Sequence, residues 1–122
     1  MSCMFVGGKF TILDLSNFDT SNVDNMGGMF IDSQVKTLDL SNFDTSNVTE
    51  MWRMFDGAQA TKIVLSSFNT SNVTNMAQMF NSSTNLKTIY VSNKFNTDKV
   101  TSSTYMFEKS TNLVGGAGTK YN

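Results

Sequence analysis

The sequence predicts an α/β solenoid in which short parallel strands alternate with short helical turns. The first reason is a recurring unit: residues 38–55 read LDLSNFDTSNVTEMWRMF, and related copies begin at Leu13, Ile63 and Ile89. The second is the regular spacing of a Met-Phe pair, whose phenylalanine returns after 25, 25, 25 and 27 residues. Self-similarity at a period of this length is typical of solenoid proteins. We therefore expect about four coils of 25–27 residues each.

The repeat spacing also predicts the domain organisation. A repeat array has no single globular core, so the 122 residues are expected to form one elongated domain. Met4 and Phe5 already match the Met-Phe pair of the later copies, so we expect the chain to begin inside a repeat and to be a piece of a longer protein. The expected segments are the end of a preceding repeat at 1–12, repeats at 13–37, 38–62, 63–88 and 89–114, and a C-terminal tail at 115–122.

The start of each copy is expected to form the strand. In the fourth copy Leu86, Ile89 and Val91 follow the pattern L-x-x-I-x-V, which is the spacing of the leucine-rich repeat. The other copies carry apolar residues at the same positions, beginning with Phe10 in the first copy. Alternation around the central pair indicates a short strand whose apolar side chains point inward. The fold expected is therefore a leucine-rich-repeat-like solenoid.

The rest of each copy is expected to turn and then to form a short helical segment. The stretch SNFDTSN contains side chains that bond to nearby backbone and favour turns. The V-x-x-M-x-x-M-F pattern that follows, as at 48–55, places its apolar residues on one face of one or two helical turns, with Trp52 off that face and exposed. Stacked coils would align phenylalanine and methionine side chains into structural ladders. The ladder residues are Phe18, Phe43, Phe68, Phe95, Met29, Met54, Met79, Met106, Phe30, Phe55, Phe80 and Phe107.

Composition argues against several function classes. The net charge is −1 and charged residues make up 16%, so no basic field attracts nucleic acid. The chain has no histidine, the commonest general base and zinc ligand, and its one cysteine is Cys3. No stretch is long and apolar enough for direct membrane insertion. We therefore expect no catalytic residues, no cofactor and no metal site; Asp14 with Asp39 would lack the desolvated cleft that carboxylate catalysis needs.

Positions that differ between copies are the best candidates for a binding site, because positions that stay constant must serve the stack. The variable positions are the outward-facing ones of the expected strands, and they change from acidic in the early copies to apolar and aromatic in the later ones. A solenoid can present such a face as an extended binding surface. A solvated face without a ligand is an equally good interpretation. The candidate ligand-face residues are Asp14, Asp39, Val64, Tyr90, Thr37, Lys62 and Thr88.

A threonine recurs in the expected turn of every copy. Thr20, Thr45, Thr70 and Thr97 occupy equivalent positions. Hydrogen bonds from these threonines to the backbone of the turns are enough to explain why they recur. A regular threonine ladder on a flat face could also order water, so an ice-binding function is a less favoured alternative.

The phrase LDLSNFDTSNVTxMxxMF, carried at 38–55 and with few changes in two other copies, resembles the BspA-like leucine-rich-repeat proteins of bacterial surfaces. The resemblance spans almost the whole chain. It implies an extracellular or cell-surface location and a non-enzymatic adhesion module that binds a host or cell-surface protein or a glycan. The alternative is a structural spacer, or a solenoid that self-assembles into homo-oligomers by end-to-end stacking of coils, because end coils expose unpaired strand edges.

Overall fold

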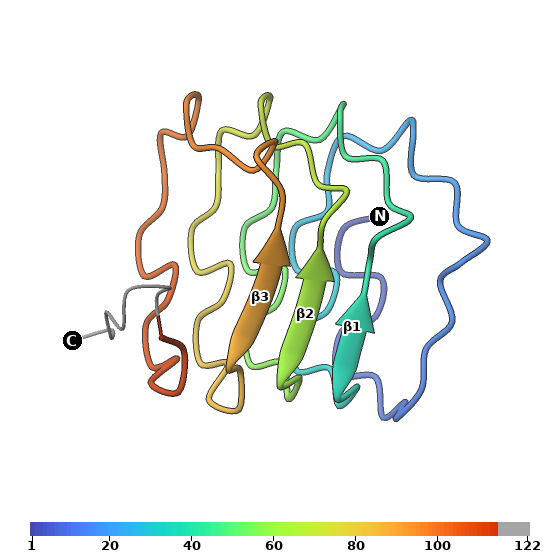
Figure 1. Cartoon of the computed structure of the whole chain (residues 1–122), viewed down its shortest axis with the longest axis vertical. Helices are drawn as coiled ribbons and strands as arrows, with labels where there is room; N and C mark the ends of the chain where they lie inside the picture. The colour runs from blue at the N-terminus through green and yellow to red at the C-terminus, as the bar shows by residue number, and fades with distance from the viewer. Residues whose placement is uncertain (115–122) are drawn as a thin grey trace.

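The chain winds into stacked coils with a small parallel sheet along one side. The computed structural model describes residues 1–114, so the expected tail at 115–122 lies outside the described residues. The sheet has three strands in the order β1-β2-β3, and Figure 1 shows them side by side. Their bounds are Thr37–Asp39 for β1, Lys62–Leu65 for β2 and Thr88–Val91 for β3. This is a repeat-like parallel fold, because each strand is separated from the next by one copy of the repeat.

Strand pairing follows the repeat spacing. Leu38 pairs with Ile63, and Ile63 pairs with Ile89, so equivalent positions of successive copies lie next to each other. On the opposite side of the coils a second parallel register joins Asn25, Glu50, Asn75 and Ser102 through single bridges. The last Met-Phe interval is 27 residues long and the others are 25, and the pairings place its two extra residues in the corners between these two sides, where they leave both registers intact.

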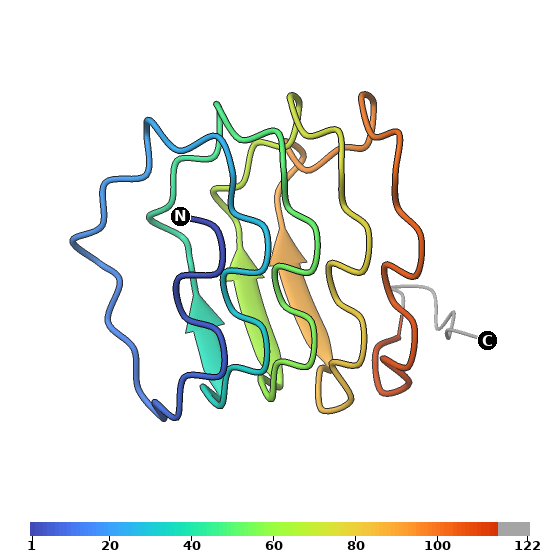
Figure 2. The ribbon, with the colours of Figure 1, turned by 180° about the vertical axis from the view of Figure 1, so that it is seen from behind.

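The expected helical turns are wrong. The described residues contain no helix, and the Met-Phe segments form turns that stack in front of the strands in Figure 2. In the second coil the N–H of Met54 donates to the carbonyl of Met51, and the N–H of Ala58 donates to that of Phe55. These are three-residue steps, so they give the same i, i+3 spacing of apolar side chains as a helix. The same spacing of apolar residues thus arises here from tandem turns.

A left-handed residue in each of these turns prevents a helix from forming. Arg53 has φ of 51° and Gly57 has φ of 67°, each at the third position of its turn, as a type II turn requires. The left-handed conformation cannot continue a right-handed helix. The alternate N–H groups that a helix would use internally donate to the next coil instead; for example, Phe30 donates to the carbonyl of Met54 at 2.9 Å.

A continuous ladder of phenylalanine rings occupies the core. Phe30, Phe55 and Phe80 are buried, and each ring stacks on its neighbour with centroids 5.7 and 5.4 Å apart. Phe5 and Phe107 extend the ladder at its two ends, at 5.6 and 5.4 Å. Of the other ladder residues, Phe43, Phe68, Met29, Met54 and Met79 are buried, whereas Phe18, Phe95, Met106 and Phe107 are partly buried. Burial is incomplete in the first and last coils, where a covering coil is missing on one side among the described residues.

The threonine ladder is internal. Thr20, Thr45 and Thr70 are buried, and only Thr97, in the last coil, is exposed. The hydroxyl of Thr45 donates to the carbonyl of Asn69 at 3.0 Å and accepts the N–H of the same residue at 2.9 Å. These hydroxyls therefore hold successive coils together.

The first coil departs from the others. Its residues 10–14 form no strand, and in Figure 1 this blue segment bows outward beside β1. Phe10, expected to point inward, is 52% exposed, and Ile12 is 87% exposed. Trp52, expected to be exposed, is partly buried, because its indole lies over Gly27 of the preceding coil; a Cβ at Gly27 would come within 2.4 Å of the ring.

Candidate ligand-binding face

Six of the seven candidate residues lie on the outward side of the three-stranded sheet. The register places Thr37 beside Lys62 and Lys62 beside Thr88, in one row across the strands. A second row joins Asp39, Val64 and Tyr90 in the same way. We call these six residues the outer face. The two rows are two residues apart along each strand, so they share one side of the sheet.

The outer face changes character from β1 to β3. Thr37, Asp39, Lys62 and Tyr90 are exposed, and Val64 and Thr88 are partly buried. The ammonium group of Lys62 lies 6.0 Å from the ring centroid of Tyr90, at the limit of a cation–π contact. Tyr90 itself is 52% exposed, so about half of the residue is open to solvent.

Asp39 has a second role in the turn that follows β1. Its carboxylate accepts the backbone N–H of Ser41 at 3.0 Å. Hydrogen bonding from the side chain and the backbone of Ser41 lowers the pKa of Asp39, and the nearby charge of Lys62 lowers it further. The carboxylate is therefore ionised at neutral pH and gives the β1 edge of the outer face a negative charge.

Asp14 lies apart from the outer face. It is exposed, but it belongs to no strand and has no pairing partner in β1. Its carboxylate accepts the N–H of Ser16 at 3.0 Å, and hydrogen bonding from Ser16 lowers its pKa. Asp14 thus repeats the turn role of Asp39 without its place on the sheet.

Val91 was missed as a candidate because its position predicts burial. It pairs with Leu65, which is fully buried, yet Val91 is 49% exposed. The difference arises because β3 is the last strand among the described residues. The repeat pattern gives Val91 the same position as Leu65, so the pattern alone does not predict the exposure of Val91.

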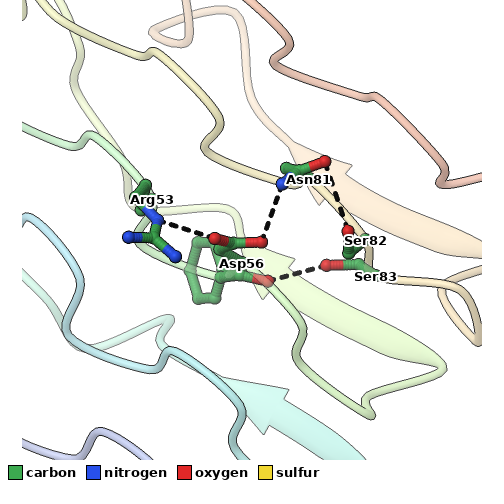
Figure 3. Close-up of polar contacts among 6 residues, drawn as sticks. Arg53, Asp56, Asn81, Ser82 and Ser83 are labelled. Carbon is green, nitrogen blue, oxygen red and sulfur yellow. Dashed lines mark hydrogen bonds and ion pairs between the residues drawn. The ribbon is translucent and has the colours of Figure 1, made fainter.

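A second group of polar side chains was also missed, and it joins two coils. Figure 3 shows the carboxylate of Asp56 between Arg53, which donates through Nε at 2.7 Å, and Asn81 of the next coil, which donates at 3.1 Å. Asp56 is 6% exposed, and both of its oxygens are bonded. Ser83 donates to the carbonyl of Phe55 at 2.7 Å in the same region. The carboxylate of Asp56 and the hydroxyl of Ser83 are thus used within the stack.

Acidic and sulfur side chains are scattered through the described part of the chain. Residues 1–114 hold no group of three or more histidine, cysteine, aspartate or glutamate side chains placed to bind a metal ion. Within the same range no helix is long and apolar enough to cross a membrane.

Comparison with known proteins gives a family without an assigned activity. No curated protein and no solved structure matches the chain. A family model described as "Mycoplasma protein of unknown function, DUF285" matches residues 1–118, which is nearly the whole chain. The stacked coils, the ring ladder and the outer face thus all lie within the matched residues. The chain belongs to the DUF285 family.

Proposed function

We propose that the chain is a leucine-rich-repeat-like solenoid of the BspA-like type and that it acts as a non-enzymatic binding module. In this proposal the outer face binds a protein or a glycan on a host or another cell, and the module works at the bacterial cell surface. The location and the adhesive role rest on the resemblance of the LDLSNFDTSNVTxMxxMF repeat. The binding site rests on the chemistry of the outer face.

One observation carries the proposal: on the outer face the exposed side chains differ between coils while the strands beneath them stay in register. Val64 and Tyr90 replace Asp39 at equivalent positions without any change in strand pairing. By contrast, the buried rings and threonines repeat from coil to coil and bond to their neighbours. A face that varies over a constant frame is how solenoids present binding surfaces.

The ligand chemistry follows from the C-terminal half of this face. Tyr90 offers a half-exposed ring, which can stack on an apolar or sugar surface, and Lys62 beside it offers three hydrogen-bond donors. Thr88 adds a hydroxyl in the same row. Tyrosine is among the residues that contribute most to interfaces, so Tyr90 is expected to be the main contact.

The internal threonine ladder argues against ice binding. Three of its four hydroxyls are buried and bonded to the next coil, so they are not available to order water.

The test is binding of the full chain to an array of glycans and matrix proteins, followed by titration of the ligand with two variants. Tyr90→Ala and Lys62→Glu should each weaken binding about tenfold or more, which is the effect of losing one interface anchor. Tyr105→Ala is the matched control, because Tyr105 is 59% exposed and lies outside the outer face. All three variants should melt close to the unmodified protein.

Two results would contradict the outer face as the binding site. One is unchanged affinity in both Tyr90→Ala and Lys62→Glu. The other is an equal loss in Tyr105→Ala, which would place the ligand elsewhere. Absence of any ligand on the array would count against a protein or glycan partner.

A further inference from the structure

A row of exposed polar side chains lies next to the outer face, where the three strands begin. Thr61 donates its N–H to the carbonyl of Lys36 at 2.9 Å, and Lys87 donates its N–H to the carbonyl of Thr61 at 2.9 Å. These three residues directly precede β1, β2 and β3, whose starts lie side by side in Figure 1. They therefore form a row beside the first row of the outer face.

The chain bends where β1 begins, and this bend exposes two successive residues. Val35 and Leu38 are buried, whereas Lys36 and Thr37 between them are exposed. A regular strand would turn one of two successive side chains inward. The two neighbouring rows thus form one surface, which we call the lysine–threonine patch. Its members are Lys36, Thr61, Lys87, Thr37, Lys62 and Thr88, of which only Thr88 is partly buried.

Lysine and threonine alternate across the patch in both rows. One row reads lysine, threonine, lysine and the other reads threonine, lysine, threonine, so no two lysines are directly opposite each other. Within residues 1–114 the only ion pair joins Arg53 to Asp56, so none of the three patch ammonium groups is paired with a carboxylate. The chain as a whole has a net charge of −1. The patch is therefore a local surplus of positive charge, interleaved with hydroxyl groups.

We propose that the lysine–threonine patch binds a linear acidic polysaccharide that runs across the three strands. This inference rests on the proposed function, because it names the ligand class of the same side of the sheet. Ammonium groups bind the carboxylate or sulfate groups of the polymer, and threonine hydroxyls bond to its hydroxyl groups. Lysine side chains are long and flexible, so ammonium groups from both rows reach one polymer chain. The half-exposed ring of Tyr90, two residues beyond Thr88 on β3, adds a surface on which a sugar packs.

The spacing of the charges favours a polysaccharide over a nucleic acid. Lys36, Lys62 and Lys87 lie in successive coils, so they offer one positive charge per about 4.8 Å along the stack. A nucleic acid carries one phosphate per about 3.4 Å of each strand, which is a higher charge density than the patch matches. A polysaccharide with one acidic group per sugar is less densely charged. Single-stranded nucleic acid sites also stack successive bases on aromatic side chains, whereas the outer face has one such ring, that of Tyr90.

The repeat supplies replacements that the fold already accepts. Lys36, Thr61 and Lys87 occupy equivalent positions, so Lys36→Thr and Lys87→Thr copy the residue of the middle coil. Thr61→Lys copies its two neighbours and adds a charge to the patch. Lys99→Asn is the matched control for loss of one positive charge, because asparagine occupies this position in the other coils. Lys99 is exposed and lies three residues before Ser102 of the second register, on the opposite side of the coils.

The experiment measures binding of the full chain to polygalacturonate and dextran sulfate over a range of salt concentration, with neutral dextran as the uncharged comparison. The unmodified protein should bind both acidic polymers and not neutral dextran. Lys36→Thr and Lys87→Thr should each weaken binding about two- to fivefold, the effect of one exposed ion contact, and Thr61→Lys should strengthen it by a similar factor. Each lysine removed should lower the slope of log affinity against log salt by about one. Lys99→Asn should match the unmodified protein in affinity and slope.

The lysine variants separate this inference from the proposed function. Unchanged affinity in Lys36→Thr and Lys87→Thr, together with losses in Tyr90→Ala and Lys62→Glu, would overturn the patch and leave the outer face as the binding site. A loss in Lys99→Asn equal to that in Lys36→Thr would also overturn the patch, because it would show attraction to the charge of the whole chain.

The choice of polymer tests the ligand class. Binding to neutral dextran as tight as binding to dextran sulfate would overturn the acidic class, although a neutral glycan bound through Tyr90 would still agree with the proposed function. Tighter binding to polyglutamate or to a single-stranded oligonucleotide than to either acidic polysaccharide would overturn the polysaccharide.

Discussion

Replacing Phe55 with alanine should destabilise the whole stack, because Phe55 lies at the middle of the ring ladder. Its side chain is fully buried, and its ring lies between Phe30 at 5.7 Å and Phe80 at 5.4 Å. Removing a buried phenylalanine costs about 3–5 kcal/mol in free energy of unfolding. Two stacked ring pairs, at about 0.5–1.5 kcal/mol each, place Phe55→Ala near the upper end of that range. A domain stable by about 5–15 kcal/mol would then lose about a third or more of its stability.

Position along the ladder supplies the control. Phe107 is only partly buried and stacks on one ring, Phe80, so Phe107→Ala should cost about 1–2 kcal/mol. Phe55→Leu keeps most of the buried volume and loses the ring pairs, so its cost should lie between those of the two alanine variants.

The assay is urea unfolding followed by circular dichroism, with the midpoint and the slope fitted for each variant. Repeat arrays are stabilised by contacts between nearest neighbours, so the central variant should shift the midpoint most. Equal shifts for Phe55→Ala and Phe107→Ala would refute the reasoning. So would a loss below about 2 kcal/mol for Phe55→Ala, since that would mean the site is not packed as a core.

Three further changes test other parts of the stack. Thr45→Val should cost about 1–3 kcal/mol by urea unfolding, because it leaves the partly buried N–H and carbonyl of Asn69 without their hydroxyl partner, whereas Thr45→Ser should cost much less. Gly57→Ala should cost about 1–2 kcal/mol from the left-handed φ of 67°, and its Cβ would also displace the carboxylate of Asp32; a neutral result would contradict the type II turn. Hydrogen bonding within the turn lowers the pKa of Asp44, so its contribution to stability is present above the unfolded pKa of about 3.9 and is lost as the pH falls through the lower folded pKa. Asp44→Asn should therefore show a weaker loss of stability between about pH 4 and pH 2, and an unchanged acid profile would contradict that role.

The repeat-like parallel fold could be predicted from the sequence because stacking imposes the same residue at the same position of each coil. The pairing of Leu38 with Ile63 and of Ile63 with Ile89 follows directly from the period. The turns could not be predicted, since tandem turns and a helix share the i, i+3 spacing of apolar residues. Tandem turns differ from a helix in having a residue with a left-handed φ. Arg53 and Gln78 have such φ values, 51° and 56°, but neither residue type indicates a left-handed conformation in a sequence.

The sequence predicted which candidate residues lie side by side, but not which of them lie at the first and last strands of the sheet. The period correctly placed Lys62 beside Thr88 and Val64 beside Tyr90. It failed for Asp14, because the first coil lacks a strand there, and it missed Val91, because the pattern contains no information on which coil is last. End effects of this kind are not encoded in a repeat and need the folded chain.

The two halves of the outer face differ in how free their side chains are, and this difference favours the C-terminal half as the binding region. In the early coils the outward aspartate is engaged in its own turn, as Asp39 is with Ser41. In the third and fourth coils Val64 and Tyr90 stand at the position of this aspartate. Neither side chain has a carboxylate to accept an N–H of the turn that follows its strand. A ligand can thus use these positions without competing with the bonds that hold the coils together.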